Sequence, residues 1–126
     1  MPPTSHDPAR NWTLEDRGDY LYVHLMGTLA TAAAVRRYQL DIEGAMTPGI
    51  GRKVIFDNRD ATPSPEELRA GMWTWLSTTP AIGRAAVVAH TARIQRRVRQ
   101  TAEDNRLRVA SFPSVEEAEA WLRGGQ

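Results

Sequence analysis

A regular alternation of strand-like and helix-like segments constrains the fold of this chain more than any other feature. Short runs rich in apolar and β-branched residues, at 53–57, 85–90 and 107–112, are each followed by a longer segment whose apolar residues recur at helical spacing. Parallel strands need such long crossover connections, and these connections are almost always right-handed. The pattern therefore predicts an α/β domain with a mostly parallel sheet.

A β-hairpin is expected before this alternation begins. Two alternating runs, 12–15 and 20–26, flank a turn that contains Gly18. In the second run the odd-numbered residues are apolar and share one face of the strand, while the even-numbered residues, among them Tyr20 and Tyr22, share the other. The hairpin brings the predicted sheet to five strands.

Four helices are expected around these strands. The first is predicted over residues 31–46 and the third over about 91–105. The second and fourth are predicted to begin at Ser64 and Ser114, each of which is followed by glutamate three residues later, a pattern typical of a capping box. The expected order is β-β-α-β-α-β-α-β-α.

Length and composition limit the class of protein. A chain of 126 residues suits one domain, which we expect over residues 11–126 after a flexible, proline-rich lead-in over residues 1–10. With 41% hydrophobic and 25% charged residues and no long apolar run, we expect a cytoplasmic protein without a transmembrane segment. The net charge of +1 gives no reason to expect nucleic acid as a partner.

Catalytic and metal-binding motifs are not recognisable in the sequence. There is no cysteine, which excludes disulfides and thiol nucleophiles, and the three histidines (His6, His24 and His90) lie far apart along the chain. Glycine-rich phosphate loops and a serine nucleophile elbow are also missing. We therefore expect a non-catalytic domain without metal or cofactor, and an enzyme that uses His90 and Asp57 stays open as an alternative.

The C-terminal stretch FPSVEEAEAWL, residues 112–122, resembles the end of SpoIIAA-like, STAS-type domains. These domains close with a strand, a phenylalanine and a helix of the form x-E-E-A-x-x-W-L, and the earlier segments fall in matching order over residues 11–123. The resemblance implies a SpoIIAA-like fold and a regulatory domain that acts through protein–protein contact. Because related CRAL-TRIO domains hold a lipid, it also implies an alternative: a small-molecule or lipid-binding domain with its pocket at the carboxyl ends of the parallel strands.

Ser64 is the residue nearest to a phosphorylation site implied by the resemblance. In anti-sigma factor antagonists the phosphorylated serine lies in an Asp-Ser-Ser-Gly motif at the start of a helix, and this motif is absent here. A phosphate on Ser64 would also lie beside Glu66 and Glu67, which would repel it. We therefore favour Ser64 as the N-cap of the second helix, with a phosphoacceptor as the alternative.

Four residues are candidates for a ligand site at the carboxyl ends of the strands. Asp57 and Arg59 leave one predicted strand, and His90 and Arg93 follow the next, where open α/β sheets bind ligands. Together they would suit a small apolar or anionic ligand. The alternative, which we favour for His90, is a partly buried histidine with satisfied ring nitrogens.

The sequence also contains two candidate interaction surfaces, one rich in arginine and one aromatic. Arg96 and Arg97 lie on an arginine-rich helix face that would suit an acidic partner, although a solvated face is the simpler account. Trp73, Tyr20 and Tyr22 could form an apolar patch for a protein partner, including a second copy in a homodimer, unless flanking helices cover them.

Overall fold

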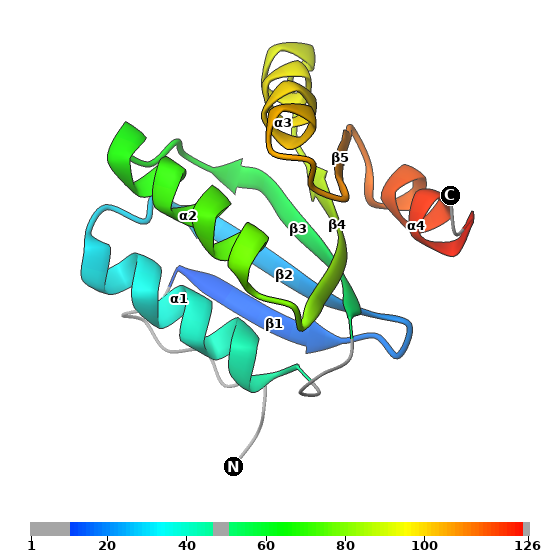
Figure 1. Ribbon diagram of the computed structural model, residues 1–126, viewed down its shortest axis with the longest axis horizontal. Helices are drawn as coiled ribbons and strands as arrows, with labels where there is room; N and C mark the ends of the chain where they lie inside the picture. Colours follow the sequence, from blue (N-terminus) through cyan, green and yellow to red (C-terminus); the bar gives the residue numbers. More distant parts are fainter. Residues whose placement is uncertain (1–10, 47–50, 125–126) are drawn as a thin grey trace.

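The computed structural model describes residues 11–46 and 51–124, which form a five-stranded sheet covered by helices (Figure 1). The expected lead-in over residues 1–10 lies outside the described residues, as do residues 47–50 and 125–126. The strands are β1 Trp12–Asp16, β2 Tyr20–Gly27, β3 Arg52–Ala61, β4 Ile82–Val88 and β5 Val109–Phe112. The helices are α1 Ala32–Gly44, α2 Glu66–Thr78, α3 Ala92–Asp104 and α4 Val115–Gly124.

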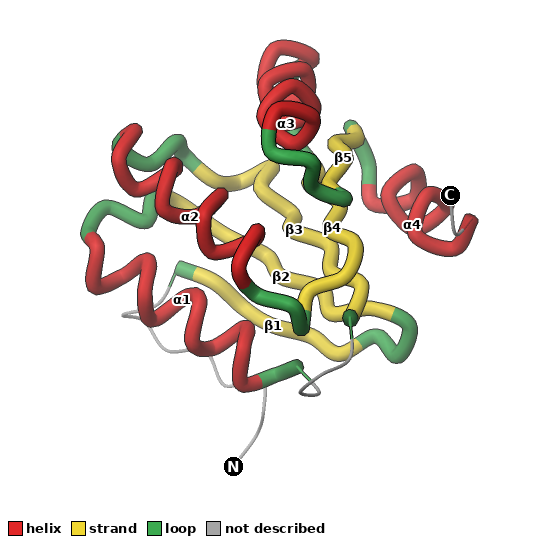
Figure 2. The backbone as a smooth tube through the Cα atoms, in the orientation of Figure 1, coloured by secondary structure: helices red, strands yellow, loops and turns green. Residues whose placement is uncertain are grey.

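The strands lie in the sheet in the same order as in the chain, from β1 to β5. β1 pairs with β2 in an antiparallel hairpin, and every later pair is parallel (Figure 2). The predicted fold class is therefore confirmed. Since successive right-handed crossovers advance in one direction across the sheet, α1, α2 and α3 lie on one side of it, and α4 packs on the other.

The core has two layers because alternate residues of each strand point to opposite faces of the sheet. On one face Val23, Val54 and Phe56 pack beneath α1 and α2. On the other face Ile55 and Val88 pack against α4, whose Ala118 and Leu122 are fully buried. β3 and β4 are consequently buried on both sides, which is typical of central parallel strands.

Helix α1 is fixed by its cap and by two indole groups. The Thr31 hydroxyl accepts a hydrogen bond from the Ala34 amide at 3.1 Å and caps the helix. Trp12 on β1 donates its indole N–H to Asp41 at 2.9 Å, and Trp75 on α2 donates to Glu43 at 2.6 Å. These bonds hold α1 to the sheet on one side and to α2 on the other.

The predicted boundary of β3 is wrong, because the strand continues past residue 57 to Ala61. Met26 and Gly27 of β2 pair with Asp60 and Ala61 of β3, so residues beyond the predicted run 53–57 are also part of the sheet. The register shifts between His24 and Met26, and this shift marks a β-bulge in β3.

The predicted N-cap role of Ser64 is also wrong, whereas that of Ser114 is confirmed. Pro65, with φ −53° and ψ 147°, is extended and occupies the N-cap position of α2 itself, without a side-chain hydrogen bond among the described residues. The helix therefore begins one residue later than expected, and Ser64 lies before the cap. At α4 the Ser114 hydroxyl accepts from the Glu117 amide at 3.3 Å, as a capping box requires.

None of the helices in residues 11–46 and 51–124 is long and apolar enough to span a membrane.

A side chain in place of Gly83, at the start of β4, is expected to clash with the backbone and to destabilise the protein. A Cβ atom there would lie 2.7 Å from the carbonyl oxygen of Gly51, which is backbone and cannot rotate away. We expect Gly83→Ala to lower the free energy of unfolding by about 1–3 kcal/mol, measured by urea denaturation. Gly71→Ala is the control: a Cβ on this α2 residue meets nothing within 4 Å, and alanine favours a helix by about 1 kcal/mol. Equal effects of the two substitutions would contradict the close approach.

Candidate functional site

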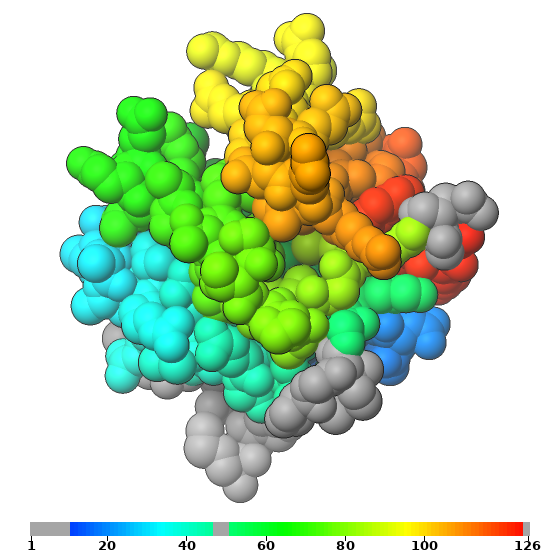
Figure 3. All heavy atoms as spheres, in the orientation of Figure 1, coloured from blue at the N-terminus to red at the C-terminus, as the bar shows by residue number. Residues whose placement is uncertain are grey.

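A cavity of about 430 Å³ lies between α2 and α3, over the carboxyl-terminal halves of β3 and β4. We call it the α2–α3 cavity. Figure 3 shows the helices that flank it as neighbouring ridges, α2 in green and α3 in yellow to orange. Its apolar walls come from the sheet (Leu25, Phe56, Val87), from α2 (Met72, Trp73, Leu76) and from α3 (Ile94, Val98).

The cavity exists because α3 has too few apolar residues to close against α2. Among the described residues of α3, Ala102 is the one that is fully buried, while Val98 is half-buried and Ile94 remains 37% exposed. The helix packs mainly on β5 and stands apart from α2 (Figure 1). The apolar residues of α3 therefore have two environments: Ala102 at the C-terminal end belongs to the core, and Ile94 and Val98 border the cavity.

Polar side chains interrupt the apolar walls, and their charge is positive on balance. Arg69 from α2 and Arg97 from α3 line the cavity with a single carboxylate, Glu66. The Arg69 guanidinium donates to the carbonyl oxygen of Ser64 at 2.8 Å, which holds it near the start of α2. Arg97 forms no ion pair within the described part of the chain. Two guanidinium groups and one carboxylate therefore leave the lining of this cavity with a net positive charge.

Asn58 on β3 also lines the cavity, and one of its polar atoms is unsatisfied. Its Oδ1 is buried and accepts no hydrogen bond. The residue follows the ordinary alternation of β3, in which Asp57 and Arg59 on either side of it lie on the opposite face and bond to one another. Asn58 therefore points to the side of α2 and α3, together with Phe56.

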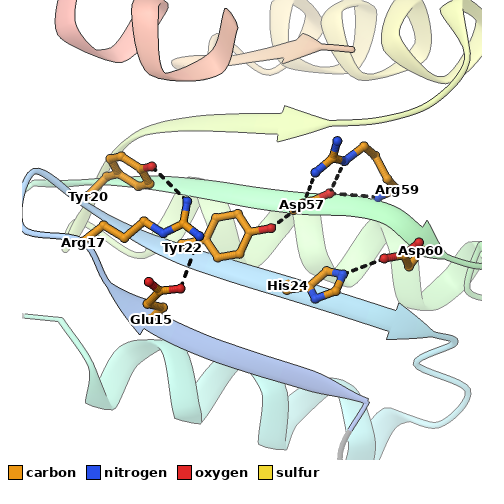
Figure 4. A network of polar contacts seen from close by, with 8 residues as sticks. All are labelled: Glu15, Arg17, Tyr20, Tyr22, His24, Asp57, Arg59 and Asp60. Carbon is orange, nitrogen blue, oxygen red and sulfur yellow. Dashed lines mark hydrogen bonds and ion pairs between the residues drawn. The ribbon is translucent and has the colours of Figure 1, made fainter. Parts of the chain in front are cut away.

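The opposite face of the sheet carries a second polar cluster, centred on Asp57 (Figure 4). The Asp57 carboxylate is 2% exposed and accepts two hydrogen bonds from the Arg59 guanidinium, at 2.9 and 2.7 Å. It also accepts from the Tyr22 hydroxyl at 2.5 Å, and the Arg17 guanidinium lies 3.8 Å from the centre of the Tyr22 ring. His24 and Asp60 form a separate contact nearby at 2.8 Å.

Ionisation in this cluster follows from its contacts. Burial disfavours the charged form of Asp57, but the hydrogen bonds from Arg59 and Tyr22 outweigh it and lower the pKa to about 2. Burial and the hydrogen bond to the Asp57 carboxylate raise the pKa of Tyr22 to about 12. At neutral pH the cluster therefore holds a buried carboxylate, a guanidinium and a neutral phenol, all with satisfied partners.

The structure does not bring the four predicted ligand residues together at the α2–α3 cavity. Asp57 and Arg59 pair with each other on the opposite face, and among the described residues neither lines the cavity. His90 lies in the turn after β4 and is exposed, so the expectation of a partly buried histidine is wrong. Arg93 is exposed on α3 as well.

The predicted interaction residues also divide between the two faces. Arg97 and Trp73 line the α2–α3 cavity, whereas Arg96 is exposed outside it. Tyr20 is only 4% exposed because α4 covers it, and its hydroxyl bonds to Glu119, so it is no part of an exposed patch. Tyr22 remains half-buried at the rim of the open sheet face.

The sequence interpretation missed Asn58 and Arg69. Asn58 lies just beyond the predicted strand end at residue 57, and because β3 in fact continues to Ala61, strand alternation places Asn58 on the same face as Phe56. Arg69 follows Glu66 by three residues on α2, so its helical position could be predicted, but its proximity to Arg97 of α3 depends on tertiary packing. Ser64 also lines the cavity, and its phosphorylation stays a prediction.

Across the described ranges no group of three acidic or histidine side chains could hold a metal ion.

Comparison with known proteins shows the fold. No protein-family model and no curated protein matches the chain. An uncharacterised protein of the DUF3478 family with a SpoIIAA-like fold, from Shewanella loihica PV-4, superposes with a TM-score of 0.67 at 16% identity, covering 88% of this chain and 91% of its own. The anti-sigma factor antagonist SpoIIAA in its unphosphorylated form superposes with a TM-score of 0.60 at 20% identity, covering 90% and 98%.

An anti-sigma factor antagonist from Mycobacterium paratuberculosis superposes with a TM-score of 0.58 at 18% identity, covering 89% of this chain and 92% of its own. All three alignments cover nearly the whole length of the solved structure. Because the sequence identity is low, the similarity shows a common fold and nothing more. The fold implied by the resemblance at residues 112–122 is confirmed.

Arg59 is expected to hold Asp57 ionised. The folded protein binds the Asp57 proton less tightly than the unfolded chain does, so this stabilisation is present near neutral pH and is lost as the pH falls from about 4 toward 2. We expect Arg59→Gln to raise the pKa of Asp57 and to lower the free energy of unfolding at neutral pH by about 2 kcal/mol. NMR titration of the carboxyl carbon and urea denaturation measure the two effects.

Arg93→Gln removes an exposed arginine and is the control for this experiment. An unchanged pKa of Asp57 in Arg59→Gln would contradict the role of Arg59, whatever happens to stability.

Proposed function

Starting from the SpoIIAA-like fold, we propose that this chain is a non-catalytic binding domain that holds a small amphipathic anion in the α2–α3 cavity. The observation that carries the proposal is the cavity itself: about 430 Å³, mostly apolar, with Arg69 and Arg97 among its few polar residues. Binding pockets for small molecules commonly have about 300–1,000 Å³ and this division between apolar walls and a few polar groups. The volume suits a molecule of a few hundred daltons.

The apolar walls favour a ligand with a hydrocarbon or aromatic body. Each CH₂ group that leaves water for such a site contributes about 0.8 kcal/mol, so a medium-length chain can bind without a strong polar anchor. Phe56 and Val87 provide the floor on the sheet, and Trp73 and Val98 provide opposite walls on the two helices.

The guanidinium groups favour an acidic group at one end of that ligand. Arg97 has no carboxylate partner in the part of the chain described, and its planar guanidinium can donate two parallel hydrogen bonds to a carboxylate or a similar anion. Arg69 is held on the other side by its bond to Ser64.

The non-catalytic part of the proposal is supported by the contacts of Asp57. An enzyme that used Asp57 and His90 would need the carboxylate free to exchange a proton. Instead both carboxylate oxygens accept hydrogen bonds from Arg59, and the low pKa keeps the group ionised. His90 is exposed in a turn after β4.

Protein binding is a second candidate function, and the part of the sheet that α4 leaves open supports it. There Arg17, Tyr22 and His24 remain partly exposed on the hairpin and its neighbour (Figure 4). Two proteins with this fold are anti-sigma factor antagonists, which supports a regulatory protein partner here too. An acidic partner on the arginines of α3 and a second copy of this chain are further candidates.

Binding of 1-anilinonaphthalene-8-sulfonate tests the cavity, because this dye joins an aromatic body to one anionic group and fluoresces when it leaves water. We expect saturable binding with one dye per chain, weakened by salt because a charged contact contributes. Arg97→Gln should weaken binding by about fivefold, and Val98→Trp, which fills the cavity, should abolish it.

Arg96→Gln is the matched control, because Arg96 lies next to Arg97 on α3 but outside the cavity. The proposal fails if Arg96→Gln and Arg97→Gln weaken binding of the dye equally. It also fails if Val98→Trp, with the circular dichroism of the wild type, binds the dye as tightly as the wild type does, because the dye is then not in the cavity.

Native mass spectrometry of protein purified gently from its own host separates the two candidate functions. The ligand-binding function predicts a discrete extra mass of a few hundred daltons, which Val98→Trp loses. A mass of two chains without any adduct would instead favour protein binding, with a second copy of the chain as the partner.

A further inference from the structure

We infer that the first two turns of α3 dock on the surface of a membrane that contains anionic lipids, with the α2–α3 cavity opening beside the bilayer. This inference goes beyond the proposed function, since it assigns a second surface and a partner for that surface. The surface, which we call the α3 arginine face, consists of the exposed side chains of Arg93, Ile94, Arg96 and Arg97.

The charge of the α3 arginine face is positive and unpaired. Residues 68–102 contain six arginines and no acidic residue. Within the part of the chain that the structure describes, the side chains of Arg93, Arg96 and Arg97 form no ion pair and no hydrogen bond. Like charges three and four residues apart on a helix repel one another, so an anionic surface against this face removes an unfavourable interaction.

An apolar side chain lies within this positive face. Ile94 is 37% exposed and is one of two large hydrophobic residues that remain exposed in the described chain. Arg97 lies one turn further along on the same side of the helix. Helices that lie on membranes combine these two features, because their cations contact anionic headgroups while their apolar side chains enter the boundary of the acyl chains.

The position of α3 leaves this face free to meet an extended surface. The helix packs mainly on β5, and its N-terminal part, drawn in yellow, projects beyond α2 at the edge of the molecule (Figure 3). Ile94 and Arg97 belong both to this face and to the lining of the α2–α3 cavity. A bilayer held against the face therefore lies beside the cavity, and an amphipathic anion has a short path from the lipid to the apolar walls.

Other anionic partners fit this face less well. Single-stranded nucleic acid binds through aromatic stacking as well as charge, and the 13 residues of α3 include no aromatic side chain. An acidic protein would neutralise the arginines, but it gives no account of the apolar cavity that opens beside them. The carboxylates of Glu66 and Glu67 at the start of α2 limit the positive surface to α3.

Co-sedimentation of the full chain with sucrose-loaded vesicles tests the inference. We expect binding to phosphatidylcholine vesicles that contain about one third phosphatidylglycerol, weakened by salt, and no binding to vesicles of phosphatidylcholine alone. The double variant Arg93→Gln/Arg96→Gln should lower the partition coefficient about twentyfold, since each arginine near an anionic membrane contributes about fivefold.

The double variant Arg37→Gln/Arg123→Gln is the matched control. It removes two exposed arginines from α1 and α4, and it changes the formal net charge from +1 to −1, as the first double variant does. It should bind the anionic vesicles as the wild type does. Equal losses in the two double variants would show that net charge alone governs the binding, and would overturn the inference.

Ile94→Gln distinguishes a lipid surface from an acidic protein. We expect this substitution to weaken binding to the anionic vesicles about fivefold, because the apolar side chain no longer enters the bilayer. Soluble polyglutamate is the comparison, and the wild type should bind it much more weakly than the vesicles. If polyglutamate competes fully with the vesicles, or if Ile94→Gln binds them as the wild type does, the face recognises acidic groups in general and the inference is wrong.

The outcomes also separate this inference from the proposed function. Val98→Trp should lose the anilinonaphthalene dye and keep the vesicles. Arg93→Gln/Arg96→Gln should keep the dye and lose the vesicles, because neither residue is part of the described cavity lining. If the wild type binds the dye but no anionic vesicles, the inference fails alone. If it binds the vesicles in the expected pattern but no dye, the proposed function fails and the membrane-docking surface stands.

Discussion

The burial of β3 and β4 on both faces is the constraint on which the rest of this structure depends. Val54, Ile55 and Val88 are fully buried, so apolar side chains leave both sides of these strands and each side needs a cover. α1 and α2 supply it on one side and α4 on the other, as the two core clusters show. This requirement explains why helices lie on both sides of the sheet, and the handedness of the crossovers explains why α1, α2 and α3 share one side.

The helices cover the sheet incompletely in two places, and these are the two candidate binding sites of the protein. On the helix-rich side, α3 is arginine-rich and packs on β5 without closing against α2, which leaves the α2–α3 cavity. On the other side, α4 covers Tyr20 but leaves the later part of β2 partly open, where Tyr22 and Asp57 form a polar cluster with Arg59. β3 connects the two places, because alternation along this strand places Asp57 and Arg59 on one face of the sheet and Asn58 on the other.

The fold could be predicted from the sequence to a large extent, and the site only in part. The alternation in β2, the first helix and the cap at Ser114 depend on local spacing, and the structure confirms them. A cavity at the carboxyl ends of the parallel strands could also be expected. Its residues could not, because Asp57 and His90 were grouped by their order after neighbouring strands, whereas β3 continues to Ala61 and carries Asp57 on the face opposite the cavity.

The sequence by itself determined the elements, their order and the mostly parallel sheet, since these follow from periodicity and from the handedness of crossovers. Only the tertiary structure decided where α2 and α3 part, and that Arg69, Arg97 and Asn58 meet around one cavity. The physical reason is that local spacing fixes the face of a helix or strand, whereas a cavity depends on how completely faces from distant segments fill the space between them.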